Sequence, residues 1–257
     1  MNFVAVIGAF FISFLQAMGR FGLFVTQVAK AFISTKFYFK QIGRQIWSIG
    51  YNSLPVVGMT AIFTGAVLAL QSYTGFSRFN AESSIASVVV LSITRELGPV
   101  LAGLMLAGRV GASIAAEIGT MKVTEQIDAL YTLNTDPFKY LVLPRVLAGI
   151  ITLPLLVVVA DIIGVFGGYL VSIYKLDFNA YSYLKSTFDF LETADVTSGL
   201  IKAAVFGFIV TTIGCYEGYN SKGGAQGVGN ATTNAVVAAS VLILLANYII
   251  TGLLFGK

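Results

Sequence analysis

Long apolar segments are the feature of this sequence that most constrains its fold. A membrane-spanning helix needs about 20 apolar residues, with a lower limit near 17. Five segments meet this requirement: residues 47–72, 85–116, 146–174, 199–216 and 231–255. Only 11% of the chain is charged, against roughly 25% in soluble domains. The sequence therefore predicts one all-α integral membrane domain, residues 1–257, with five transmembrane helices and short connections.

A shorter apolar run precedes these segments. Residues 1–30 are interrupted by Gln16 and Arg20, which leaves about 17 uninterrupted residues, near the lower limit for a span. A helix with Arg20 and Lys30 on its wet side can instead lie in the membrane interface. We therefore predict an interfacial, membrane-lying N-terminal helix within residues 1–44, with a sixth span as the alternative.

Lysines and arginines are distributed unequally between the two sides of the predicted bundle. Nine lie on the side that holds the N-terminus and the loops 117–145 and 217–230: Arg20, Lys30, Lys36, Lys40, Arg44, Lys122, Lys139, Arg145 and Lys222. Four lie on the other side: Arg78, Lys175, Lys185 and Lys257. Because cytoplasmic loops are rich in basic residues, we expect the N-terminus inside and the C-terminus outside. The glycine-rich loop 217–230 lacks the Lys-Ser/Thr of a P-loop, and we expect a flexible connection there.

Charged residues within the predicted spans mark a candidate site. Arg95 and Glu96 precede Pro99 near the outer end of the second span. Intramembrane charges are costly and usually face a cavity or a partner, and adjacent helical residues point about 100° apart, so these two need not pair. Pro99 frees a backbone carbonyl, which suits a cavity wall. Snorkelling to the interface explains Lys202 equally well, whereas Asp161, in mid-span, needs a polar partner or a cavity.

Small residues recur at every fourth position of the second span: Gly103, Ala107, Gly111, Ala115 and Gly119. On a helix they form a ridge that lets another backbone approach closely. The ridge serves either packing within the chain or contact with a second subunit. Alanines of the fifth span offer a further surface of this kind: Ala231, Ala235 and Ala239.

The polar segment 117–145 lies between the second and third spans. Thr124, followed by Glu125 and Asp128, predicts an N-cap with acidic residues in the first turn of a short helix, which Pro137 ends. An apolar face follows from i, i+3, i+4 spacing: Ile127, Leu130 and Tyr131. We predict a short cytoplasmic coupling helix that docks into a partner; an amphipathic helix resting on lipid is the alternative.

Several short sequence motifs in this part of the chain are specific. Glu125 is followed 19 positions later by Pro144 in Leu-Val-Leu-Pro, which is similar to the coupling motif of ABC importer permeases, although Gln126 and Ile127 replace its alanines and Tyr131 its glycine. The further motifs are RELGPVL (95–101), AGRVGA (107–112), AEIGTM (116–121), TEQIDAL (124–130) and LPR (143–145). On these residues, and over essentially its whole length, the chain resembles the MlaE family, the permease subunits of ABC systems that work with MCE proteins on phospholipids.

This resemblance implies a homodimer bound to two cytoplasmic ATPase subunits and to a periplasmic MCE-domain hexamer. It also implies a multi-pass protein of the bacterial inner membrane that moves phospholipid between the inner and outer membranes and maintains outer-membrane asymmetry. ATP and Mg²⁺ would be bound by the partner ATPase. We expect no catalytic residue, cofactor or metal site in this chain, which has no histidine and one cysteine, and no nucleic-acid partner.

Two functions of other classes are the alternatives. A membrane-embedded lipid-modifying enzyme needs acids such as Glu96, Glu117 and Asp161 to converge. An ion-coupled secondary carrier is disfavoured because the sequence has no matching broken helices in its two halves.

Two sets of site residues are expected. For lipid binding they are Leu68, Leu70, Tyr73, Arg95, Glu96 and Leu97, with Arg95 meeting a phosphate and Glu96 orienting Arg95 or gating the opening. For coupling to the ATPase they are Arg109, Glu117, Glu125, Ile127, Asp128 and Leu130, with Arg109 and Glu117 bracing the short helix.

Overall fold

The structure, a computed structural model, describes residues 3–33 and 38–256, with side chains described from residue 9 onward except at residues 10 and 14. Within these residues the protein is helical and has no strand. Six helical segments of the described chain are long and apolar enough to cross a membrane. Lys36 and Lys257, which entered the charge comparison, lie outside the described residues.

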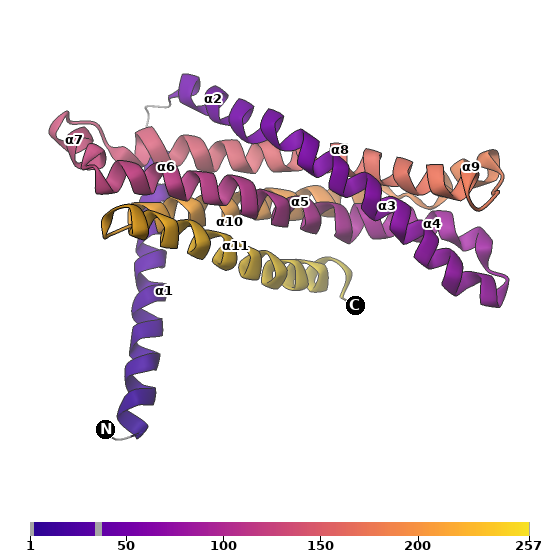
Figure 1. Ribbon diagram of the computed structural model, residues 1–257, viewed down its shortest axis with the longest axis horizontal. Helices are drawn as coiled ribbons and strands as arrows, with labels where there is room; N and C mark the ends of the chain where they lie inside the picture. The colour runs from indigo at the N-terminus through magenta and orange to yellow at the C-terminus, as the bar shows by residue number, and fades with distance from the viewer. Residues whose placement is uncertain (1–2, 34–37, 257) are drawn as a thin grey trace.

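The first of these segments is α1 (Phe3–Ile33). The next combines α2 (Phe39–Gly50) with α3 (Leu54–Phe76), and the third combines α4 (Ile85–Ser92), α5 (Gly98–Leu106) and α6 (Ala112–Val123). The others are α8 (Leu143–Tyr174), α10 (Thr193–Tyr219) and α11 (Gly224–Phe255). Two short helices, α7 (Gln126–Thr132) and α9 (Ala180–Phe190), lie at opposite ends of the bundle (Figure 1).

The first helix differs from the other five long segments in direction. In Figure 1, α1 runs crosswise to the bundle and meets it near the end that carries α7. It is attached there by Phe24, Val28 and Ala31, which are buried, and the Phe24 ring packs against those of Phe138 and Tyr216. Length and composition alone would allow α1 to span a membrane, but its direction is not that of the bundle.

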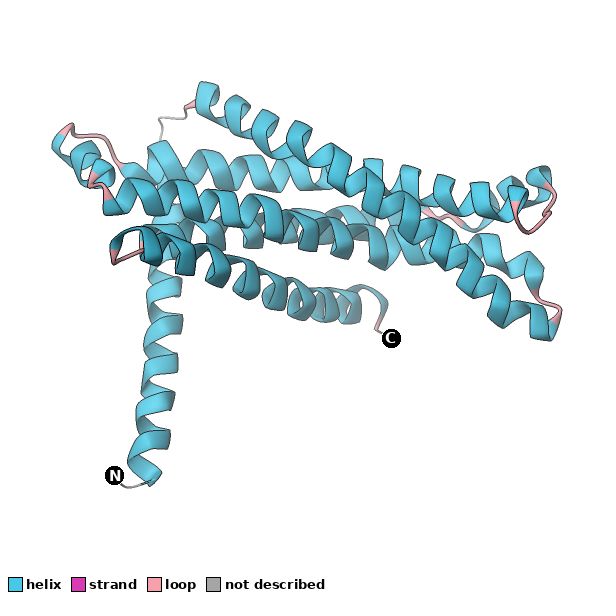
Figure 2. Ribbon diagram, in the orientation of Figure 1, coloured by secondary structure: helices cyan, strands magenta, loops and turns pink. Residues whose placement is uncertain are grey.

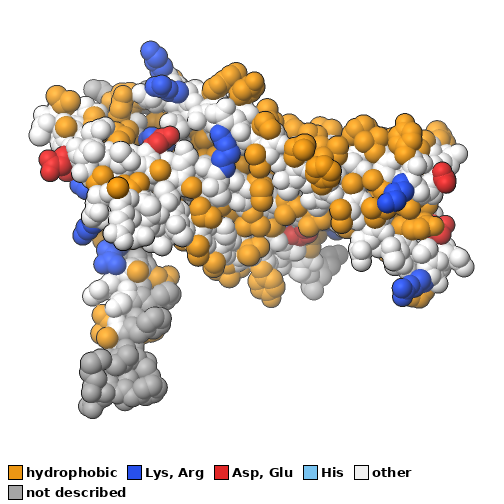
Figure 3. Space-filling view, viewed as in Figure 1, with side chains coloured by type: hydrophobic (Ala, Val, Ile, Leu, Met, Phe, Trp, Pro, Cys, Tyr) orange, Lys and Arg blue, Asp and Glu red, His pale blue; other side chains and the backbone are white. Residues whose placement is uncertain are grey.

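Loops and charged side chains are concentrated at the ends of the bundle. Figure 2 shows the loops at the two ends of the long helices. In Figure 3, hydrophobic side chains cover the middle of the visible face, and most lysines, arginines and acids lie toward its ends. This distribution matches a bundle whose middle is surrounded by hydrocarbon.

The small-residue ridge is used for packing within the chain. A Cβ on Gly103 would lie 3.2 Å from the Phe206 ring of α10, and one on Gly119 would lie 3.4 Å from Ser221. Ala107 and Ala115 are fully buried. The alanines of α11 are buried too: Ala231, Ala235 and Ala239. Of the two alternatives, the ridge thus serves packing within the chain, where α10 and α11 cover it, and α6 and α10 cover the alanines of α11.

Glycines also bring α8 into close contact with its two neighbours. A Cβ on Gly65 of α3 would overlap the carbonyl oxygen of Gly164, and one on Gly207 of α10 would overlap that of Gly149. Backbones can approach this closely only where no side chain intervenes. The third predicted span, α8, is thereby fixed between α3 and α10.

Two local predictions are wrong. Thr124 ends α6, where its hydroxyl donates to the Thr120 carbonyl at 2.8 Å, and the chain turns at Glu125 (φ 62°) before α7 begins. The glycine-rich connection is shorter than expected because α11 begins at Gly224, directly after Gly223 (φ 88°). The first turn depends on one residue with a positive φ and the second on two, Gly223 and Gly224, and apolar periodicity does not reveal such residues.

Three π-helical turns interrupt the long helices, at Ile93–Leu97, Ala107–Gly111 and Phe138–Val142. Such turns are rare and are frequent at functional sites. The first contains Arg95 and Glu96, and the second contains Arg109. The intramembrane charges of the second span thus coincide with its irregular backbone.

Candidate functional site

The first π turn (Ile93–Leu97) and Pro99, which follows it, leave a backbone carbonyl free to bind a cation. Pro99 has no N–H, so the carbonyl of Arg95, four residues earlier, lacks its helical partner. The Lys202 ammonium of α10 donates to this carbonyl at 2.8 Å. The prediction that Pro99 frees a carbonyl is confirmed, and the group that uses it is Lys202.

Glu96 joins three parts of the bundle. Its Oε1 lies 2.7 Å from the Lys202 ammonium and 3.1 Å from the Thr251 hydroxyl, and its Oε2 accepts from Asn247 at 2.9 Å. Lys202 is fully buried, so snorkelling does not explain it. A buried charge is tolerated when it is paired and its other hydrogen bonds are made, and this arrangement meets both conditions.

Arg95 has a different partner. Its Nε lies 2.5 Å from Oδ1 of Asp195, which is fully buried, and its guanidinium lies over the Phe255 ring, 4.7 Å from the centroid. Oδ2 of Asp195 accepts from the backbone N–H of Glu192 in the capping box of α10. The expectation that Glu96 orients Arg95 is therefore wrong: Asp195 orients it. About a third of the Arg95 side chain (35%) stays exposed, so this cation is accessible to a ligand.

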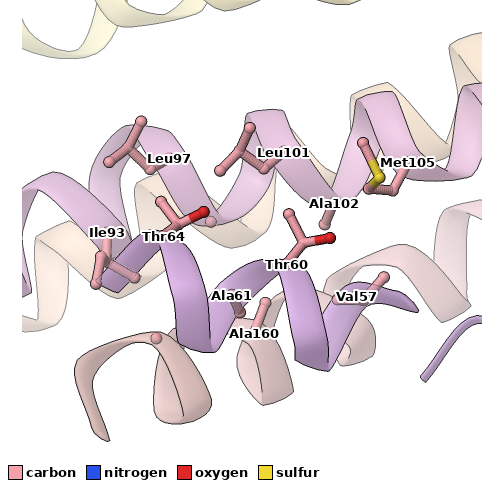
Figure 4. Close-up of a pocket in the computed structure, with 12 residues that line it drawn as sticks. Val57, Thr60, Ala61, Thr64, Ile93, Leu97, Leu101, Ala102, Met105 and Ala160 are labelled. Atoms are coloured by element: carbon pink, nitrogen blue, oxygen red, sulfur yellow. The ribbon is translucent and has the colours of Figure 1, made fainter. Parts of the chain in front are cut away.

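An apolar groove runs beside these charges. Leu97, Leu101 and Met105 of the α4–α6 segment line this groove together with Thr60 and Thr64 of α3 (Figure 4). The groove encloses only about 20 Å³, so a lipid tail does not fit in it within a single protomer. Of the six residues predicted to bind lipid, Leu97 alone lines this groove.

The first three predicted lipid residues lie on α3. Leu68 and Tyr73 pack against a separate small core that includes Ile85 and Ile93, and the Tyr73 ring lies 5.9 Å from that of Phe178. Leu70 is half-buried and is not in that core. Leu68 and Tyr73 thus lie against the core that contains Ile93 of the first π turn, and their role in lipid binding stays a prediction.

Asp161 of α8 lies against an apolar cavity of about 490 Å³ between α8, α9 and the start of α10. Its Oδ1 is buried without a hydrogen-bond partner among the described residues and packs against Gly98, where a Cβ would overlap it. The expected cavity is present. Tyr183 lines the same cavity from α9, and burial raises the pKa of its phenol.

The acids needed for a lipid-modifying enzyme do not converge. Glu117 lies 21 residues along the same helical segment from Glu96, about 30 Å at 1.5 Å per residue. Glu117 pairs with Arg145, and Glu96 pairs with Lys202. Glu96, Glu117 and Asp161 therefore do not form one catalytic centre in this structure.

The opposite end of the bundle carries α7. Ile127 is fully buried in the main core, and Leu130 packs against it. Ile127 and Leu130 therefore attach α7 to its own bundle, because their burial removes apolar surface from water. Asp128 pairs with Lys122 at 3.0 Å. The side chains that α7 presents outward include Glu125, Tyr131 and Leu133.

The bracing of α7 also differs from the expectation. Glu117 accepts from the largely buried Arg145 at 3.0 Å, and Arg145 also donates to the Leu141 carbonyl at 2.9 Å, which ties α6 to the start of α8. Arg109 instead donates to the Ser53 hydroxyl at 2.6 Å. Arg109 thus joins the second π turn to the α2–α3 junction and does not brace α7.

Sequence reasoning missed Asp195, Asn247 and Thr251 and undervalued Lys202. Signals for them exist. Asp195 and Lys202 are seven residues apart, which is two helical turns and one face, and Asn247 and Thr251 are four apart in an apolar run. Polar residues that share one face of a span indicate a buried partner.

Comparison with known proteins adds the family context. The model of the family described as permease MlaE matches residues 42–253. A probable ABC transporter permease of Rickettsia felis is 65% identical over 255 residues, which covers 99% of this chain and 98% of that protein. The Haemophilus influenzae protein named intermembrane phospholipid transport system permease protein MlaE is 36% identical, over 99% of this chain and 98% of its own length. A probable ABC transporter permease of Synechocystis is 43% identical over 82% of this chain.

Proposed function

The chain belongs to the MlaE family of ABC transporter permeases, and we propose that it moves phospholipid between the inner membrane and a periplasmic MCE-domain hexamer. In this role it maintains the lipid asymmetry of the outer membrane and has no catalytic residues of its own. ATP and Mg²⁺ are bound by separate ATPase subunits. The observation that supports this most directly is the separation of two polar regions along one bundle, the Arg95–Glu96 network within the spans and α7 at one end of the bundle.

The proposed topology has five spans with α1 in the plane of the membrane. Its support is the crosswise direction of α1 and the basic residues near it, since cytoplasmic segments are rich in lysine and arginine. In this orientation α7 faces the cytoplasm, and α9 and the C-terminus face the periplasm.

Coupling to the ATPase is assigned to the exposed surface of α7. Glu125 and Asp128 offer charges, and Tyr131 and Leu133 offer exposed apolar contact area. Ile127 and Leu130 attach the helix to the bundle, and the Glu117–Arg145 ion pair connects α6 to α8. Force applied to α7 would thus reach two long helices.

The lipid site is assigned to a cavity shared by two copies of the chain. The groove at Leu97 is too small for a lipid tail in one protomer, and two-fold dimers are the commonest closed assembly. Arg95 would meet the phosphate, because part of its guanidinium is accessible and planar donors suit phosphate oxygens. Glu96 holds Lys202 in place and keeps the network intact.

Reconstituted transport tests this function. The permease, its ATPase and the MCE protein are placed in vesicles with a fluorescent phospholipid, and transfer to acceptor protein is followed with and without ATP. We expect ATP-dependent transfer that Leu97→Trp blocks, whereas Leu155→Trp, on the exposed surface of α8, leaves it unchanged. Transfer that proceeds equally without the permease would refute the proposal.

A further inference from the structure

A large cavity lies where α1 meets the bundle, far from the Arg95–Glu96 network. It has a volume of about 1070 Å³ and is formed by α1, the end of α10 and α11. Its apolar wall includes Phe21 of α1, Ile213 of α10 and Leu242 of α11. Ligand cavities of about 300–1,000 Å³ accommodate molecules of drug size, so this one has room for a large part of a lipid.

The same cavity carries charges of both signs. Arg20 of α1 and Lys222, just before α11, line it together with Glu217 of α10. Arg20 and Lys222 are exposed, and neither forms an ion pair with any residue that the structure describes. Two cations from separate elements, without anionic partners, thus border an apolar wall.

From this combination we infer that the cavity holds a phospholipid whose head group carries both a phosphate and a primary amine. Arg20 and Lys222 bind the phosphate, Glu217 binds the ammonium, and an acyl chain lies against Phe21 and Leu242. Basic pockets between helices on the cytoplasmic side of a membrane are suited to phospholipid head groups. The inference depends on the proposed orientation, which puts this end of the bundle at the cytoplasmic leaflet.

This lipid would stay bound to the permease and is distinct from the transported lipid. It fills the angle between α1 and the bundle, so it would hold α1 against α10 and α11. A helix from a second copy is a poorer occupant, since its apolar surface would leave Arg20 and Lys222 without counter-charges next to hydrocarbon.

Photo-labelling tests the head-group contacts. The full-length permease is reconstituted in phosphatidylcholine vesicles containing a phosphatidylethanolamine with a diazirine in one acyl chain, and labelled peptides are identified by mass spectrometry. We expect labels at Phe21 and Leu242. Each basic residue contributes about fivefold to lipid affinity, so R20Q/K222Q should lower labelling about 25-fold at low probe concentration. The matched control K175Q/K185Q, at the other end of the bundle, should label normally.

A second pair of variants tests the cavity without changing charge. Cβ atoms at Gly22 and Gly19 would meet no atom within 4 Å, and only Gly22 lines the cavity. We expect Gly22→Leu to lower labelling and Gly19→Leu to leave it unchanged. Glu217→Gln should reduce labelling by the amine-bearing probe relative to a phosphatidylglycerol probe.

Either of two results would overturn the inference. One is equal labelling in R20Q/K222Q, Gly22→Leu and the unmodified protein. The other is a disulfide between two copies that carry Met18→Cys and Leu245→Cys, which would identify a second chain as the occupant. The labelling requires neither ATPase nor MCE protein, so its failure would leave the proposed transport function untouched.

Discussion

The Lys202 ammonium lies 2.7 Å from Oε1 of Glu96 and 2.8 Å from the Arg95 carbonyl. One cation from α10 thus neutralises a carboxylate in the second span and also occupies the carbonyl that Pro99 leaves free. Because both charges lie within spans, neither is stable without the other.

Removal of one partner of this pair should destabilise the protein. Breaking a fully buried ion pair costs about 3–5 kcal/mol because it leaves a charge uncompensated, and since 37% of the Glu96 side chain is exposed we expect the loss to fall at or below the lower end of this range. We expect Lys202→Met to lower the melting temperature of the purified protein sharply, and Glu96→Gln/Lys202→Met to recover much of the loss. Lys185→Met, on α9, is the control. Equal destabilisation in the single and double variants would contradict the pairing.

Arg95 should matter for transport as well as for stability. Its guanidinium is partly exposed and is held by Asp195, and a hydrogen bond to a charged group contributes about 1.5–3 kcal/mol, roughly tenfold or more in binding. Removal of Arg95 alone leaves the fully buried Asp195 carboxylate without its cation, so we expect Arg95→Ala to lower the melting temperature. Arg95→Ala/Asp195→Asn leaves no such charge, and we expect it to lower lipid transfer about tenfold with a smaller change in melting temperature. Arg78→Ala, an exposed arginine at the same end, should transport normally. Normal lipid transfer in Arg95→Ala/Asp195→Asn would show that the role of Arg95 is structural.

The two faces of α7 should respond differently to substitution. Ile127→Ala creates a cavity in the core, at a cost of about 2–5 kcal/mol, so its abundance in the membrane should fall. Leu133→Ala and Glu125→Lys change exposed residues, so abundance should be normal while lipid-stimulated ATP turnover drops. The comparison needs a fluorescence measure of abundance beside an ATPase assay. Normal ATP turnover in both exposed variants would exclude α7 as the coupling element.

Close glycine contacts should tolerate no side chain. Gly65→Val would push a side chain into the Gly164 carbonyl of α8, and overpacking costs about 1–3 kcal/mol or more. Gly75→Val, later in the same helix, would meet no atom within 4 Å and is the matched control. We expect only Gly65→Val to aggregate or melt early in size-exclusion and thermal assays. Similar behaviour of the two variants would mean that α3 and α8 are further apart than described.

Apolar length and charge were enough to predict five of the long segments, the need of Arg95 and Glu96 for a polar surrounding within a span, and the carbonyl freed by Pro99. These features are local in sequence. The helix that supplies the partner of each charge is distant in sequence. Glu96 and Lys202 are 106 residues apart, and only the packing of α10 against the α4–α6 segment brings them together.

The surface against which the Ile127 side chain packs could not be predicted for a related reason. An i, i+3, i+4 pattern defines an apolar face, but the same face can turn toward a partner or toward the protein's own core. The turn at Glu125 decides this, through a positive φ that the sequence does not signal. The π turns are equally hidden, since they follow from packing rather than from residue preference.

Phospholipid should pass the groove at Leu97 during ATP-driven transport. The most direct test places a photo-crosslinking amino acid at position 97 of the assembled transporter and measures attached phospholipid with and without ATP. We predict that capture of phospholipid at position 97 changes with ATP turnover. Capture at position 155, on the exposed surface of α8, should not change. The opposite result, no capture at position 97 with ATP-dependent capture at position 158 or 162 beside Asp161, would place the lipid path in the cavity between α8 and α9.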